Sequence, residues 1–122
     1  TDNVDSMQKT LQLSLDLCTM AWNGYPVMAL PGSELYKRAK ESGEKLPERY
    51  EEYSFHGYHT SPLPTKELEP NQILAFRDNA FTTYHNYPRF IEKVRNRFGD
   101  IAVNNIKDML TVTLSRKLVE EA

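Results

Sequence analysis

The sequence predicts a mainly α fold with one short extended segment near its start and one long irregular stretch in its middle. Apolar residues recur every three or four positions through most of the chain, as in amphipathic helices. Ser33 and Pro70 are typical helix-starting residues, and Gly43 and Gly99 are typical helix-ending ones. The chain has 122 residues, a length at which one domain is expected.

Residues 1–43 are predicted to form a helix, a strand and a second helix. The first helix is expected over 3–17, where the apolar positions follow a helical spacing. The apolar run 20–30 is short enough for a buried strand, although Pro26 requires a bulge or a bend within it. Ser33 then supplies the hydroxyl that caps the second helix.

Residues 44–69 lose this periodicity, and we expect them to form a long ordered loop. Connections of this length are uncommon in compact domains and are often functional lids. Disordered segments are poor in aromatic residues, so the composition argues against a flexible linker. The aromatic and imidazole side chains of the stretch are Tyr50, Tyr53, Phe55, His56, Tyr58 and His59.

Residues 70–122 are predicted to form a bundle of three helices. Pro70 is well placed as the first residue of a helix, and Pro88 follows a break in the pattern. Gly99 ends the second helix, and the third is expected to run from Asp100 to about Leu118. The connections between these helices are short, which favours a compact arrangement.

The composition excludes several classes of function. A net charge of −2 gives no electrostatic footprint for nucleic acid or an anionic membrane, so we expect neither as a partner. No apolar run approaches the roughly 20 residues that a membrane-spanning helix requires. Cys18 is the single cysteine, which fits a reducing, cytoplasmic location and excludes an internal disulfide or a cysteine-held cluster.

No catalytic or metal-binding residue emerges from the spacing of reactive side chains. His56 and His59, with Glu51 and Glu52 nearby, could ligate a metal, but hydrogen-bonded loop histidines are the preferred interpretation. Cys18 falls on an apolar helix stripe and reads as a core residue. The only basic cluster reads as a solvated helix end, and its members are Arg89, Lys93, Arg95 and Arg97.

Several strings, taken in order, resemble a known family. Residues 28–36, which read MALPGSELY, resemble the strand-to-helix element near the end of the radical S-adenosylmethionine (SAM) partial barrel. Residues 53–66 are similar to a segment that follows it in cobalamin-binding Fe–S oxidoreductases of that superfamily. The pattern continues through residues 75–78, 97–99 and 114–118.

This resemblance implies that residues 1–43 are the last βα element of a partial TIM-type barrel. Met28, Ala29 and Leu30 would then lie on a strand close to bound SAM in the complete enzyme. The parent would carry a 4Fe–4S cluster on a Cys-x-x-x-Cys-x-x-Cys loop, together with SAM and cobalamin. That loop is not in this chain, so no cofactor is assigned to it and activity of the chain alone is not expected.

The resemblance also suggests a role for the aromatic stretch. Tyr53, His56, Tyr58 and His59 could close over the open end of the barrel as a lid, or they could simply pack the loop onto the helical bundle. The expected function is therefore that of a C-terminal accessory region, whose partner is the remainder of the barrel. The alternative is a stand-alone helical interaction module that docks onto a partner through an exposed apolar face. Self-association through apolar surface is expected of the fragment, whose first helix and strand lack their barrel neighbours, whereas a strictly monomeric chain favours the independent module.

Overall fold

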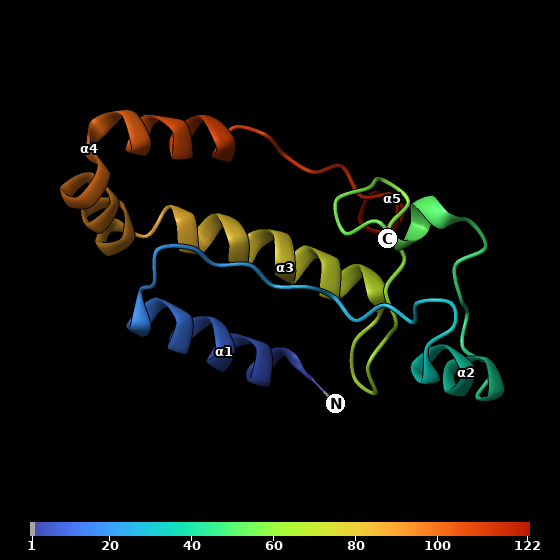
Figure 1. Cartoon of the computed structure of the whole chain (residues 1–122). Coiled ribbons are helices and arrows are strands. Elements are labelled where there is room, and N and C mark those ends of the chain that lie inside the picture. Colours follow the sequence, from blue (N-terminus) through green and yellow to red (C-terminus); the bar gives the residue numbers. More distant parts are fainter. Residues whose placement is uncertain (1) are drawn as a thin grey trace. The chain divides into compact units, whose positions relative to one another are not determined.

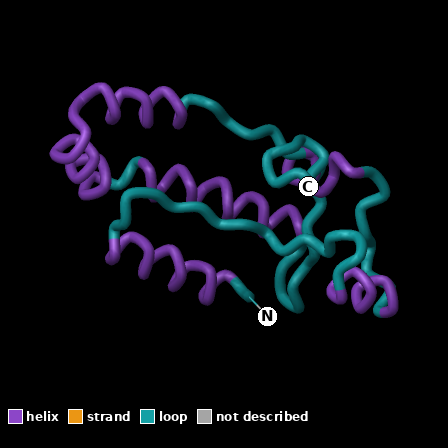
Figure 2. The backbone as a smooth tube through the Cα atoms, in the orientation of Figure 1, coloured by secondary structure: helices purple, strands orange, loops and turns teal. Residues whose placement is uncertain are grey.

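The computed structural model describes residues 2–122 and confirms a mainly α fold (Figure 1). Residues 2–122 contain no β-strand (Figure 2). None of the helices in this range combines the length and the apolar composition that crossing a bilayer requires. The helices are α1 (Val4–Leu17), α2 (Glu34–Glu41), the 3-10 helix η1 (Tyr50–Tyr53), α3 (Pro70–His85), α4 (Pro88–Leu110) and α5 (Lys117–Glu120).

The chain folds into two compact units. Residues 2–3, 25–77 and 114–122 form unit 1, and residues 4–24 and 78–113 form unit 2. The boundary between the units falls inside α3, so this helix contributes to both.

In unit 2, side chains of α4 bind the carboxyl end of α1. Arg89 Nη1 donates to the carbonyl oxygen of Asp16 at 2.9 Å, and Lys93 Nζ donates to that of Cys18 at 2.6 Å. The last carbonyls of a helix have no partner within it, so these two cations satisfy acceptors that α1 leaves open. Cys18 itself is fully buried and adopts a left-handed φ of 49°, which ends the helix.

Within unit 2, the residues directly after α1 pack against the last part of α3 (Figure 1). Tyr84 of α3 is fully buried, and its hydroxyl donates to the carbonyl oxygen of Thr19 at 2.5 Å. The Trp22 ring stacks on the Tyr84 ring, with centroids 6.0 Å apart, and Trp22 Nε1 donates to Ser14 Oγ. A buried tyrosine and tryptophan that keep their polar ends bonded fix this segment without leaving unpaired donors. The buried apolar side chains of unit 2 are Leu11, Leu15, Cys18, Ala80, Tyr84, Phe90, Val94 and Val103.

Gly99 divides α4 into two helical halves, as the sequence predicts. Its φ of 83° and ψ of −179° lie in a region that is essentially restricted to glycine. Asp100 begins the second half, and its carboxylate accepts from Arg95 Nε at 2.9 Å.

In unit 1, α2 has the caps that the sequence predicts. Ser33 Oγ accepts from the Tyr36 amide, which satisfies one of the first N–H groups of the helix. Gly43 takes a left-handed φ of 75°, and the Glu44 amide bonds back to the Ala39 carbonyl. The buried apolar side chains of this unit are Met28, Ala29, Ala39, Leu68, Ile73 and Leu74.

Two predicted elements are wrong. The strand expected within 20–30, and with it the strand of a βα barrel element at Met28, Ala29 and Leu30, is an extended segment without pairing. A strand needs a neighbour to exchange hydrogen bonds with, and residues 2–122 offer none for a continuous ladder.

The last helix also ends earlier than predicted. It stops at Leu110, and the chain runs without regular structure to Arg116 before α5 begins. Thr111, Val112 and Thr113 are β-branched, and such residues lose side-chain freedom in a helix. Thr111 Oγ1 instead bonds to the Asp108 carbonyl and caps the helix end.

Candidate functional site

The candidate site is the aromatic segment, residues 53–60, which follows η1 in unit 1. It is irregular but extensively hydrogen-bonded, and it lies beside α5 (Figure 1). The sequence singled out four of its side chains, and the structure places each in a different environment.

Tyr53 closes η1 and is half-buried. Burial raises the pKa of its hydroxyl above the ordinary value of 10.0, and the nearby Tyr36 and Glu52 act in the same direction. Glu52 shows the opposite shift. The amides of Arg49 and Glu48 each donate to its Oε2 at 2.8 Å, and the bond from Arg49 is the main reason that the pKa of Glu52 is lowered from 4.5. Because Tyr53 is half-buried at the end of η1, its side chain belongs to the packing of this 3-10 helix.

His56 is exposed and lies near the middle of α3. Its Nε2 is 3.5 Å from Nη2 of Arg77, a buried guanidinium. The neighbouring Phe55 ring meets the Tyr25 ring edge-on, with centroids 4.9 Å apart. These contacts attach the first half of the aromatic segment to other parts of unit 1.

Tyr58 and His59 are in contact with one another. Their rings meet edge-on with centroids 5.0 Å apart. The Tyr58 hydroxyl donates to Glu120 Oε2 at 3.1 Å, and this bond is the main reason that the pKa of Tyr58 is raised above 10.0. Within residues 2–122, no ring contact joins this pair to Tyr53 or His56, so the four side chains do not form one cluster.

Thr60 and Arg116 stand at the centre of the segment, and the sequence did not point to either of them as site residues. Thr60 is fully buried and Arg116 is 2% exposed. Arg116 Nη1 donates to the Gly57 carbonyl at 3.1 Å and to Thr60 Oγ1 at 3.0 Å. Thr60 Oγ1 lies within hydrogen-bonding distance of the carbonyls of Gly57 and Ser54. Arg116 lies 59 positions beyond Gly57, near the end of the last predicted helix, so no local pattern could reveal its burial.

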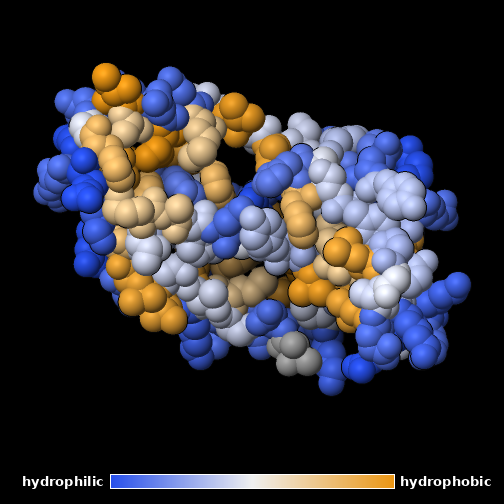
Figure 3. All heavy atoms as spheres, in the orientation of Figure 1, coloured by the Kyte–Doolittle hydropathy of each residue, from blue (hydrophilic) through white to orange (hydrophobic). Residues whose placement is uncertain are grey.

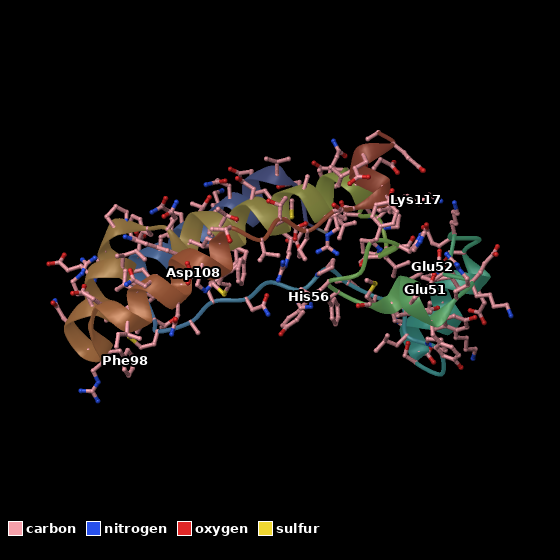
Figure 4. All side chains as sticks on the ribbon, turned by 90° about the horizontal axis from the view of Figure 1, so that it is seen from above. Glu51, Glu52, His56, Phe98, Asp108 and Lys117 are labelled. Atoms are coloured by element: carbon pink, nitrogen blue, oxygen red, sulfur yellow. The ribbon has the colours of Figure 1, made fainter. Side chains whose placement is uncertain are left out.

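The histidines and acids of this region do not gather into a metal site. In Figure 4, His56 lies apart from Glu51 and Glu52, which sit together on η1. Among residues 2–122, no group of three histidine, cysteine, aspartate or glutamate side chains is arranged to hold a metal ion.

Met28, Ala29 and Leu30 do not line a common surface. Met28 and Ala29 are buried at 9% and 2% exposure, whereas Leu30 is 51% exposed. The Leu30 carbonyl accepts from both the amide and the hydroxyl of Ser33, which forms the turn into α2.

The basic cluster of α4 acts within unit 2. Arg89 and Lys93 bind carbonyls at the end of α1, and Arg95 pairs with Asp100. Three of its four members therefore have structural contacts, whereas the sequence suggested a solvated helix end.

Comparisons with known proteins identify no relative. No protein-family model matches the chain. Searches of curated protein sequences and of solved structures likewise gave no match.

Proposed function

We propose that this chain is the C-terminal accessory region of a radical SAM Fe–S oxidoreductase, which helps to close or shape the substrate site and is not catalytic alone. The order of the family-like strings along the sequence supports this proposal. The structural observation that supports it best is the extended segment 25–30, which leads through the Pro31-Gly32-Ser33 turn directly into α2.

The first four residues of this segment have the side-chain pattern of a strand, but the segment lacks strand neighbours. Pro26 and Met28 are buried, whereas Tyr25 and Val27 are 61% and 58% exposed. Over residues 25–28 this alternation has the period of a β-strand with one face on the core, and it stops at Ala29, which is buried next to Met28. The Val27 carbonyl accepts from the Leu63 amide, and this is a single bond and not a ladder.

The backbone of the segment is also largely unpaired. Among residues 2–122, no other part of the chain bonds to the amides of Val27, Met28, Ala29 and Leu30 or to the carbonyls of Met28 and Ala29. Val27 and Leu30 are exposed to solvent, so the buried groups among these are those of Met28 and Ala29. Leaving a buried backbone group without a partner costs about 1–3 kcal/mol, so such groups are normally bonded. Strands of a surrounding barrel would supply the partners, and this is why the segment favours an origin in a larger sheet.

The cofactors of such an enzyme do not fit this chain. A 4Fe–4S cluster needs several thiolates, and Cys18 is the only cysteine and is fully buried. Met28 and Ala29 direct their side chains into the core of unit 1 and are not available to contact SAM. The cluster, SAM and cobalamin are therefore assigned to the rest of the parent, and this chain takes no chemical step.

The contribution proposed for this chain is a wall over the substrate site, which is the lid expected from the aromatic segment. Radical intermediates must be shielded from water and stray hydrogen donors, and a bulky apolar cover does so. The exposed ring surfaces of Tyr58 and His56 are the parts of the aromatic segment that remain free to face a neighbour.

The reading frame upstream of Thr1 tests the identity of the parent. We expect it to continue into a loop with the Cys-x-x-x-Cys-x-x-Cys spacing. A start codon immediately before Thr1 contradicts the proposal and favours the stand-alone module.

Substitutions in the intact enzyme test the role of the wall. We expect His56→Ala and Tyr58→Ala to lower turnover of substrate, because each removes ring surface from the cover. Tyr50→Ala is the matched control, since Tyr50 is 90% exposed at the start of η1. Unchanged turnover in folded His56→Ala and Tyr58→Ala variants rules out the wall.

A second candidate, an independent interaction module, is favoured by the outer face of α1. Leu13 and Leu17 are 60% and 62% exposed and lie one turn apart, on the side of the helix opposite the buried Leu11 and Leu15. Apolar side chains also remain exposed on the face shown in Figure 3. Exposed apolar side chains that gather into a patch mark interaction sites, and Leu13 with Leu17 are the residues of α1 on which this candidate rests.

A further inference from the structure

We propose that the C-terminal residues 114–121 act as a strap that holds the aromatic segment in place. The Arg116 guanidinium is the main hydrogen-bond donor from this strap to the segment. The proposal rests on contacts within unit 1 and stands whether or not the parent is a radical SAM enzyme. Displacing the strap would rearrange the surface that carries His56, Tyr58 and His59.

The two backbone–backbone hydrogen bonds within the aromatic segment are long. The Gly57 amide reaches the Ser54 carbonyl at 3.3 Å, and the Thr60 amide reaches the Gly57 carbonyl at 3.4 Å. Both distances lie beyond the usual 2.7–3.2 Å range of a protein N–H···O bond. The stronger bond of the region, from the Ser61 amide to the Glu52 carbonyl at 2.9 Å, joins only its ends.

The buried hydroxyl of Thr60 cannot donate a hydrogen bond to both of the carbonyls that lie next to it. It lies within donating distance of the carbonyls of both Ser54 and Gly57, yet a hydroxyl has only one hydrogen. One of these carbonyls therefore needs another strong donor.

Arg116 supplies that donor. Its Nη1 carries two hydrogens and lies 3.1 Å from the Gly57 carbonyl and 3.0 Å from Thr60 Oγ1. With one hydrogen on the Gly57 carbonyl and one on the hydroxyl oxygen, the Thr60 hydrogen is free to serve Ser54. The guanidinium thus completes a network that the aromatic segment cannot complete itself, and buried networks gain most when every member is satisfied.

Two further hydrogen bonds join the strap to the aromatic segment beside Arg116. The Lys117 amide donates to the Tyr58 carbonyl at 3.0 Å, and the Tyr58 hydroxyl donates to Glu120 Oε2 at 3.1 Å. Figure 1 shows α5 beside the loop that follows η1, and Figure 4 marks Lys117 on that helix. The strap therefore touches the aromatic segment through Gly57, Tyr58 and Thr60.

Hydrogen exchange of the full-length chain tests this inference, with the amides of Gly57, Thr60 and Ser61 as reporters. We expect Arg116→Ala to accelerate their exchange about 10- to 100-fold, because hydrogen bonds to a charged group are lost. Exchange in α4 should not change, and its protection shows that unit 2 remains folded. Equal exchange of the three reporter amides in Arg116→Ala and the parent chain overturns the proposal.

Lys117→Ala is the matched control. Its side chain makes only an exposed ion pair with Glu121 at 4.0 Å, and the substitution keeps the backbone amide that binds Tyr58. We expect exchange of the reporter amides to change less than about 2-fold, as is typical of exposed ion pairs. An acceleration as large as that of Arg116→Ala also overturns the proposal, because it means that any change in α5 loosens the segment.

A double-substitution cycle tests the network itself. Thr60→Val removes the hydroxyl that Arg116 binds, so the effects of Thr60→Val and Arg116→Ala on the free energy of opening should not be additive. We expect the double variant to exchange at most about 3-fold faster than the faster single variant. If the two substitutions multiply each other's effect on the exchange rates of the reporter amides, the network is overturned, since this shows that the two residues act independently.

Discussion

Gly99 allows α4 to turn between its two halves because no other residue adopts its backbone conformation without strain. A Cβ added there would meet no atom within 4 Å, so the constraint comes from φ and ψ and not from crowding. Gly43 differs, because its conformation is the ordinary left-handed cap that asparagine also tolerates.

We expect Gly99→Ala to lower the free energy of unfolding by about 1–3 kcal/mol. Urea unfolding followed by Trp22 fluorescence measures this, since Trp22 is the only tryptophan and packs within unit 2. Asn105→Ala, at an exposed position of the same helix, should have little effect or be slightly stabilising. Equal stability of Gly99→Ala and the parent chain contradicts the strain assigned to Gly99.

Thr60 and Arg116 show the limit of residue-level prediction. His56 and Tyr58 could be selected from composition, because a long loop rich in aromatic residues is unusual. Arg116 could not, because arginine is normally exposed and its burial depends on a carbonyl 59 positions away. Its role is decided by tertiary contacts alone.

At the scale of elements, η1 is stabilised by a carboxylate whose charge depends on pH. Glu52 accepts from two backbone amides, so its pKa is lower in the folded chain than the ordinary 4.5. The stabilisation is therefore present above pH 4.5 and is lost as the pH falls through the lowered pKa.

We expect an NMR titration of the Glu52 carboxyl to show its midpoint below pH 4.5. The amide signals of Glu48 and Arg49 should shift with the same midpoint, because these amides donate to that carboxylate. Glu52→Gln should remove this transition from both amides. A midpoint at or above 4.5 contradicts the contacts at η1.

The end of α1 is a second element whose stability depends on side chains from elsewhere. We expect Lys93→Met to destabilise unit 2 by about 1 kcal/mol, since it removes a charged donor from the Cys18 carbonyl at a partly exposed site. Trp22 fluorescence in urea again gives the free energy of unfolding. Lys107→Met, at an exposed position of α4, is the control, and an equal effect of the two substitutions argues against the cap.

Helices with their own signals were predictable, and elements that need a distant partner were not. Ser33 and Gly43 bound α2, and Pro70 begins α3, because caps act through the nearest backbone groups. The segment 20–30 has a strand-like sequence, but pairing is a property of two segments, and residues 2–122 contain no strand beside it.

At the scale of the whole molecule, self-association of the chain stays a prediction, and it rests on the exposed Leu13 and Leu17 of α1. We expect its sedimentation coefficient to rise with concentration, and Leu13→Glu combined with Leu17→Glu to abolish the rise, because charge at an apolar contact is costly. Gln8→Glu with Gln12→Glu adds the same charge at exposed polar positions and should leave association intact. A chain that remains monomeric at all concentrations contradicts this expectation.

The sequence by itself determined the mainly α character, the starts and ends of most helices, and the irregular aromatic stretch. These features follow from side-chain periodicity and from caps, which act over a few residues. Only the tertiary structure decided that the chain divides into two units within α3, and that Arg116 is buried beneath the aromatic segment. The physical reason is the same in both cases: burial and hydrogen-bond satisfaction depend on which distant segments meet, and no local pattern records that.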